Sequence, residues 1–198
     1  MPKDTLADVS DDTLLVLYAN GDAEAARTLT LRLVPRALSY SGRLLGDRTE
    51  AEDVVQEAMM RLWRMAPDWR PGEAQVSTWL YRVVSNLCLD RKRAQKRRPA
   101  VTLDDAPDLA SGGPDAVTGM MQDQRMAALN DALSALPERQ RRAVMLRHIE
   151  GLANPEIAEI LEIGVEAVES LTARGKRSLT AALGGKRAAL GYHGEAED

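Results

Sequence analysis

The sequence predicts an all-α protein with two small helical domains joined by a flexible acidic linker. Aromatic residues make up only 4% of the 198 residues and phenylalanine is missing, whereas β-sheets favour aromatic side chains. The chain is instead rich in Ala, Leu, Glu and Arg, which favour helices. Residues 99–124, between two stretches of helical periodicity, contain five aspartates and no lysine or arginine. Acidic polar segments resist packing, so this middle stretch predicts a linker.

The domain boundaries follow from that middle stretch. Ser111-Gly112-Gly113-Pro114 interrupts regular structure near its centre, because Gly and Pro are strong breakers. A chain of 198 residues has room for two small domains. We expect a first domain over 11–98, a linker over 99–117 and a second domain over 118–186.

Composition also limits where the protein works. The single cysteine, Cys88, excludes an internal disulfide framework and fits a reducing cytoplasm. No apolar run approaches the ~20 residues that a membrane helix needs, and the polar residues 1–12 do not resemble a secretory signal. We therefore expect a cytoplasmic protein without membrane contact. The formal net charge of −4 argues weakly against a nucleic-acid partner, but the distribution of charge matters more.

The first domain begins with three expected helices. Gly21 separates a short helix from a longer one over about 22–45, which Pro35 should kink or break. Thr49 and Glu52 then form a capping-box pattern at the start of the third helix. The apolar face of that helix is made of Val55, Ala58, Met59, Leu62 and Trp63, at three- and four-residue spacing.

A fourth helix begins near Ser77 and continues into a basic extension over 91–98. Residues 82–98 carry seven positive charges and one negative charge, a track that can follow a phosphate backbone. Aromatic residues just upstream suit stacking on unpaired bases of single-stranded DNA. These are Trp69, Trp79 and Tyr81. The alternatives are a solvated helix end for the basic run and a place in the core for Trp79.

A helix-turn-helix pattern lies in the second domain. Asn154 is expected to cap a short helix with Pro155 at its first position, and a turn at 162–164 leads to a longer helix. Gly175 should weaken the far end of that helix by about 1 kcal/mol relative to alanine. The exposed side of the longer helix suits a DNA groove and consists of Glu166, Glu169, Ser170, Ala173, Arg174, Lys176 and Arg177. The alternative is an ordinary helical hairpin with a solvated charged face.

The sequence does not support catalysis. His148 and His193 are isolated from each other and from cysteine, so we expect no metal site. No nucleophile has an evident partner and no glycine-rich phosphate loop occurs, so we expect neither an enzyme nor a bound cofactor. By composition alone, Asp53, Gln56 and Glu57 form a solvated acidic helix face.

Four segments carry motifs in a distinctive order: Ala51–Arg64, Val76–Arg91, Ala135–Arg141 and Asn154–Lys176. The first resembles the polymerase-binding helix of the extracytoplasmic-function (ECF) sigma factors of the sigma-70 family. The second resembles the helix of that family that reads and melts the −10 element. The last two are similar to its C-terminal, −35-reading helix-turn-helix. The resemblance covers about three-quarters of the chain and implies sigma region 2 in the first domain and region 4 in the second.

The resemblance implies roles for individual residues. Binding to the clamp helices of the largest polymerase subunit would fall to Asp53, Gln56 and Glu57. Reading of the −10 element and melting would involve Trp79, Tyr81, Asn86, Arg91, Arg93 and Arg97. The loop over 70–75 would select a base flipped from the non-template strand. The −35 element would be bound by Ser170, Arg174, Lys176 and Arg177.

The resemblance also implies partners and a function. The partners would be core RNA polymerase, including the flap of its second-largest subunit, promoter DNA in double- and single-stranded form, and an anti-sigma factor. The chain would direct promoter-specific initiation in a stress or envelope response. One rival hypothesis is a conventional regulator that binds duplex DNA without polymerase. Another is a decoy that mimics a sigma factor without binding DNA.

Overall fold

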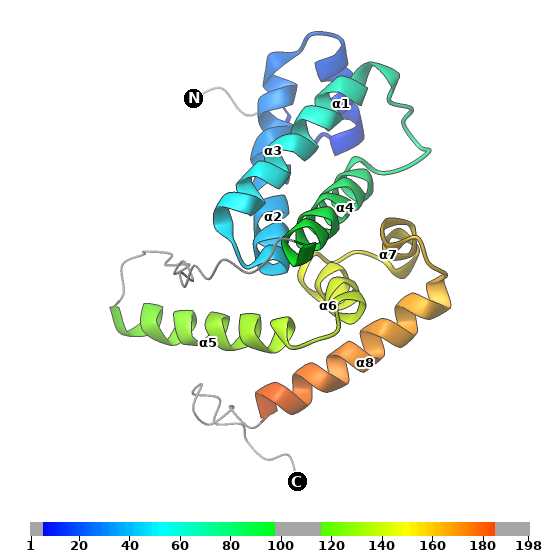
Figure 1. Ribbon diagram of the computed structural model, residues 1–198. Coiled ribbons are helices and arrows are strands. Elements are labelled where there is room, and N and C mark those ends of the chain that lie inside the picture. The colour runs from blue at the N-terminus through cyan, green and yellow to red at the C-terminus, as the bar shows by residue number, and fades with distance from the viewer. Residues whose placement is uncertain (1–5, 98–115, 185–198) are drawn as a thin grey trace. The chain divides into compact units, whose positions relative to one another are not determined.

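The computed structural model describes residues 6–97 and 116–184, with side chains of the second stretch described from Gln124 onward (Figure 1). The chain divides into two compact units. The first comprises residues 1–105 together with 155–162, and the second comprises 106–154 together with 163–198. The expected linker therefore lies almost entirely outside the described residues, as do Arg98 and His193.

The first unit is a helical bundle. Its helices are α1 (Asp11–Ala19), α2 (Ala23–Leu45), α3 (Arg48–Met65), the short 3-10 helix η1 (Ala66–Asp68) and α4 (Val76–Arg97). The same unit also includes all but the first residue of α7 (Asn154–Leu161). Helices α2, α3 and α4 pack against one another, and α1 packs on α2 (Figure 1). The buried core of this bundle includes Leu14, Leu15, Leu29, Leu33, Leu62, Leu80 and Val84.

Short polar side chains start the first three helices. Ser10 caps α1 and Asp22 caps α2, each accepting hydrogen bonds from amides of the first turn. The start of α3 differs from the expected capping box, because Asp47 is the cap and its carboxylate accepts from the Glu50 amide at 3.0 Å. Aspartate is as good a cap as threonine, and its position two residues earlier places Thr49 inside the first turn.

Pro35 does not end α2, which continues as one helix of 23 residues. The expected break is therefore wrong, although a proline does remove one backbone donor. Pro35 is exposed, and the residue whose carbonyl loses its partner, Leu31, has a side chain 66% exposed. Water can solvate a carbonyl on this side of the helix, which lowers the cost of the proline.

The second unit contains α5 (Ala116–Ser134), α6 (Glu138–Val144), the π-helical turn η2 (Met145–Ile149) and α8 (Val165–Gly184). Helix α8 packs on α6 and α5. Leu133, Met145 and Leu146 are fully buried. Throughout the described ranges the secondary structure is helical, apart from an isolated bridge between Pro71 and Ala74.

Helix α8 continues past Gly175 to Gly184, so the fraying expected beyond this glycine is not found in the described helix. The glycine is buried, and a Cβ atom at this position would overlap Cγ2 of Val144 on α6. The missing side chain therefore allows α8 and α6 to approach closely.

The turn before α8 is tight. Glu162 adopts a left-handed backbone conformation with φ 55°, which is uncommon for a residue other than glycine. The Gly164 carbonyl then accepts from the amides of Ala167 (3.0 Å) and Val168 (3.2 Å) and starts α8. The expected Asn154 cap is not formed, because α7 already begins at Asn154 and its Oδ1 has no hydrogen-bond partner among the described residues.

Candidate polymerase and nucleic-acid interface

An acidic face lies on the outer side of α3. Asp53 and Gln56 are exposed, and the side chain of Glu57 is 42% exposed and pairs with Arg61 at 2.5 Å. Met60, one turn after Gln56, is 47% exposed. Single exposed apolar side chains are common on protein surfaces, so Met60 adds apolar area to this face without marking an interface by itself. Met60 was not among the residues expected to bind polymerase, although its four-residue spacing from Gln56 places it on the same side of α3.

Arg91 connects two of the expected sites. Its guanidinium donates to the Glu50 carboxylate at 2.5 Å and lies 3.6 Å from that of Asp53. The hydrogen bond to Glu50 is the main reason why the pKa of Arg91 is raised above its ordinary value. Arg91 was expected to face DNA and Asp53 to face polymerase, and the structure brings them together between α4 and α3. Arg91 therefore binds the acidic end of α3 in this conformation.

A different side of α4 carries a continuous polar and basic stripe. Asn86, Arg93 and Arg97 are exposed, and their spacings of seven and four residues place them on one helix face. Trp79 lies seven residues before Asn86 on the same face and is half-buried. Arg93 pairs with Asp90 at 3.3 Å in the open, so this ion pair is easily exchanged for a phosphate.

Tyr81 lies in the core rather than on this stripe. It is only 3% exposed, and its ring meets that of Tyr40 edge-on at 5.3 Å. The Arg36 guanidinium lies 6.0 Å from the Tyr81 ring centroid. Sequence reasoning grouped Tyr81 with Trp79, but residues two apart point to different sides of a helix. A base contact by Tyr81, as expected from the resemblance, is therefore incompatible with the burial of this ring.

The loop over 70–75 is held at both ends. At its start, the Trp69 indole Nε1 donates to the Asp12 carboxylate at 3.1 Å. At its end, Val76 is fully buried as the first residue of α4. Between them the chain turns at Gly72, with φ 90°, and Arg70 lies 3.6 Å from Glu73.

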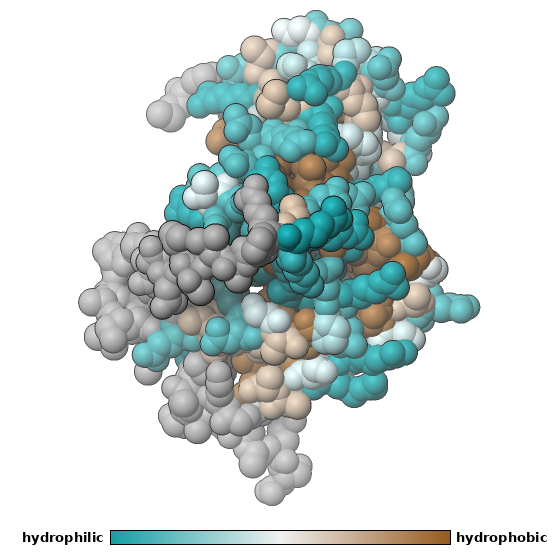
Figure 2. Space-filling model, in the orientation of Figure 1, coloured by the Kyte–Doolittle hydropathy of each residue, from teal (hydrophilic) through white to brown (hydrophobic). Residues whose placement is uncertain are grey.

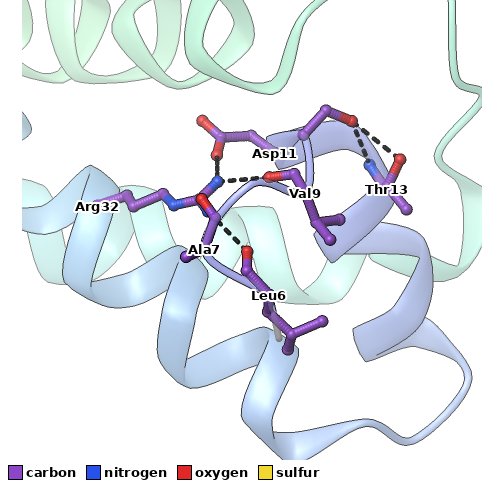
Figure 3. A network of polar contacts seen from close by, with 7 residues as sticks. Leu6, Ala7, Val9, Asp11, Thr13 and Arg32 are labelled. Carbon is purple, nitrogen blue, oxygen red and sulfur yellow. Dashed lines mark hydrogen bonds and ion pairs between the residues drawn. The ribbon is translucent and has the colours of Figure 1, made fainter. Parts of the chain in front are cut away.

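Helix α1, which supplies Asp12, is itself held by a polar network (Figure 3). Arg32 of α2 donates to the backbone carbonyls of Leu6 (2.8 Å), Ala7 (2.6 Å) and Val9 (2.6 Å). The same guanidinium pairs with the Asp11 carboxylate at 3.0 Å. One arginine thus fixes the segment that leads into α1 and the first turn of the helix.

Helix α8 presents its own polar stripe. Ser170, Arg174 and Arg177 are exposed, and their spacings of four and three residues place them on one face. Lys176 is also exposed but lies on another side of α8, toward His148 of η2. Burial first, and then the charges of Lys176 and Arg147, lower the pKa of His148. The four residues expected to bind the −35 element are thus divided between two sides of the helix.

Most of the described surface on the face drawn in Figure 2 is hydrophilic. Among the residues whose side chains are described, the exposed large apolar ones are Leu31, Met60, Met126, Ile149 and Val165. Within the described ranges no helix has the length and apolarity required to cross a bilayer. In the same ranges no three His, Cys, Asp or Glu side chains gather in a way that could hold a metal ion.

Comparison with known proteins matches two segments of the chain to parts of one protein family. Residues 29–98 match sigma-70 region 2, and residues 126–179 match sigma-70 region 4. RNA polymerase sigma-H factor of Pseudomonas aeruginosa is 31% identical over 90% of this chain and 96% of its own. The ECF RNA polymerase sigma factor SigM of Mycobacterium tuberculosis strain H37Rv is 34% identical over 88% of this chain and 85% of its own.

Solved structures support the same fold. CnrH, determined in complex with the cytosolic domain of CnrY, aligns with a TM-score of 0.66 at 24% identity, over 88% of this chain and 97% of its own. The sigma factor RpoE of Bartonella quintana, determined with the anti-sigma factor NepR, aligns with a TM-score of 0.64 at 18% identity, over 82% and 98%.

The fold, the acidic and basic helix faces and these matches define a sigma-70 class protein with regions 2 and 4. Within that class, the chain belongs to the ECF sigma factors of RNA polymerase, so the resemblance seen in the sequence is confirmed.

Proposed function

We propose that this sigma factor binds core RNA polymerase through α3 and promoter DNA through α4 and α8. The observation that carries the proposal is the separation of charge on the first unit. The outer side of α3 carries exposed acidic and polar residues around Met60, whereas α4 carries an exposed basic stripe. One small bundle can therefore meet a basic protein surface and a phosphate backbone at the same time.

The polymerase contact is assigned to Asp53, Gln56, Glu57 and Met60. The carboxylates would meet basic residues of the clamp helices of the largest subunit, and Met60 would supply apolar contact between them. The exposed i,i+4 pair between Glu57 and Arg61 contributes little to stability, so Glu57 can exchange Arg61 for a partner at low cost. The flap of the second-largest subunit is the matching partner for region 4.

The −10 contact is assigned to the α4 stripe and the loop over 70–75. Arg93 and Arg97 would hold backbone phosphates, and Asn86 would offer both a donor and an acceptor to a base edge. Trp79 is the aromatic side chain of this face and would stack where the duplex opens. Tyr81 and Arg91 have no direct DNA role in this assignment, because one is in the core and the other binds Glu50.

The −35 contact is assigned to Ser170, Arg174 and Arg177 of α8. Arginine reaches phosphates and guanine edges, and serine permits a close approach to the groove. Lys176 would contact the DNA backbone beside this stripe. An anti-sigma factor is also proposed as a partner, by analogy with the complex of the Bartonella quintana sigma factor with NepR.

The polymerase interface can be tested by reversing charge at Asp53 and Glu57. We expect the Asp53→Lys/Glu57→Lys variant to bind purified core polymerase about tenfold more weakly, because two attractive charges become repulsive. The matched control is Glu24→Lys, a charge reversal at an exposed glutamate of α2 that also pairs along its helix, with Arg27. Equilibrium binding of labelled protein to core polymerase is measured, with circular dichroism to verify folding. Unchanged affinity of the folded double variant, or an equal loss in the control, would contradict the assignment.

A further inference from the structure

We propose that Asp12 is a specificity-determining positioning residue, which acts through Trp69 to orient the loop over 70–75. This inference rests on the proposed function, in which that loop selects a base of the −10 element. Asp12 lies in the first turn of α1, 57 residues before Trp69 in the chain. It would touch no DNA itself, and its effect on promoter choice would pass through a single hydrogen bond.

Trp69 is held at two points. It is the residue that ends η1, and its backbone amide donates to the Ala66 carbonyl at 3.2 Å. Helix η1 packs against α1 and α3, and Ala66 is buried. The indole Nε1 donates to Asp12 at 3.1 Å. Trp69 is thus fixed through its backbone on one side and through its ring on the other.

The loop itself is short. Only six residues join Trp69 to the buried Val76, so movement at the Trp69 end must be passed on to the tip. The turn at Gly72 and the bridge between Pro71 and Ala74 make the loop compact. The exposed polar side chains of the loop are Arg70, Glu73 and Gln75. These polar side chains are suited to reading the edge of a flipped base.

Asp12 is anchored as well. Ser10 caps α1, Arg32 holds the adjacent Asp11, and Leu14 and Leu15 are fully buried two and three residues further on. Asp12 therefore offers Trp69 an acceptor on a rigid support. A hydrogen bond to an anchored carboxylate fixes the direction of the indole ring, which ring packing alone leaves freer.

The experiment compares three variants in run-off transcription with core polymerase. Trp69→Phe keeps an aromatic ring and removes the N–H donor, Asp12→Ala removes the acceptor, and Asp12→Asn keeps an acceptor oxygen as the matched control. The measured quantity is the ratio of transcript from an active promoter to transcript from the same promoter with one −10 base replaced. We expect this ratio to fall about three- to tenfold in Trp69→Phe and Asp12→Ala for at least one −10 position. A change of this size corresponds to the free energy of one lost hydrogen bond. Asp12→Asn should stay closer to the wild-type ratio.

Core polymerase affinity and the thermal unfolding midpoint are measured in parallel. An unchanged ratio at every −10 position in both variants would overturn the proposal. So would an equal loss on all promoters or unfolding of both variants, because those results describe a purely structural pair. If the wild-type protein yields no transcript at all, the proposed function itself fails, and the inference fails with it.

Discussion

Gly175 lies in the middle of α8, at a point where this helix passes close to α6. In an open helix, alanine in place of glycine stabilises by about 1 kcal/mol. At this site an added Cβ would overlap Cγ2 of Val144, which is 3% exposed and, being β-branched, has a restricted χ1. The Gln140 carbonyl oxygen is also only 3.4 Å from the position of that Cβ. The packing of α8 on α6 therefore depends on a residue without a side chain.

Gly175→Ala should consequently lower the free energy of unfolding, by about 1–3 kcal/mol as for other overpacked cores. The control is Gly184→Ala in the same helix, where an added Cβ meets nothing within 4 Å and no loss is expected. The double variant Val144→Ala/Gly175→Ala should recover part of the loss, because the smaller side chain makes room. Urea denaturation followed by circular dichroism measures all three. Equal stability of Gly175→Ala and Gly184→Ala would show that α8 and α6 can move apart to admit the added Cβ without loss of stability, which would contradict the prediction.

Single residues were the least predictable part of the candidate site. The exposed positions of Asp53, Gln56, Asn86 and Arg93 agree with helical periodicity, which reports which side of a helix faces the core. Tyr81 was misjudged because sequence neighbours were treated as spatial neighbours. The bond between Asp12 and Trp69 could not be anticipated, because periodicity contains no information on contacts between residues 57 positions apart.

Arg91 joins α3 to α4 at the level of helix packing. Its side chain is 30% exposed, and that of its main partner, Glu50, is 32% exposed. Water screens such a half-buried pair less than a surface pair, so its hydrogen bond contributes more than that of an open ion pair. The contact fixes the acidic end of α3 against α4, two helices that carry the proposed polymerase and DNA surfaces.

Glu50→Gln should therefore lower the free energy of unfolding by about 1 kcal/mol. This value lies between the contribution of an exposed ion pair and that of a hydrogen bond to a buried charged group. Glu52→Gln is the matched control on the same helix, since Glu52 pairs within α3, with Arg48, at side-chain exposures of 52% and 71%. We expect a change below about 0.5 kcal/mol for the control. Urea denaturation compares the two, and equal effects would mean that Arg91 does not join the helices energetically.

The helices themselves were largely predictable, and their ends were not. Apolar residues at three- and four-residue spacing predicted α3, α4 and α8, because burial of one face is what stabilises a helix in a small domain. The start of α3 was misplaced because Asp47 and Thr49 are both good caps, and the choice between them depends on the packing of the whole helix. The extent of α2 was predicted, but the break expected at Pro35 is not found, since propensity does not report whether the carbonyl that loses its partner faces solvent.

For the whole molecule, the net charge of −4 conceals a strong separation of charge. Seven positive charges and one negative charge lie in residues 82–98, whereas the segment 99–124 contains no positive charge. A uniformly acidic protein would be repelled by DNA, but segregated charge lets one chain bind a polymerase and a promoter. Composition alone could not distinguish a uniformly acidic protein from one with segregated charge. The order of the motifs along the chain made that distinction.

The central claim is that this chain gives core RNA polymerase a promoter specificity. The most direct measurement is run-off transcription on genomic fragments with the native core enzyme, with and without the protein. The account predicts discrete new transcripts whose start sites share two upstream motifs, at the −35 and −10 positions. The absence of such transcripts, together with tight binding of the protein alone to duplex DNA, would contradict the account and favour a conventional regulator.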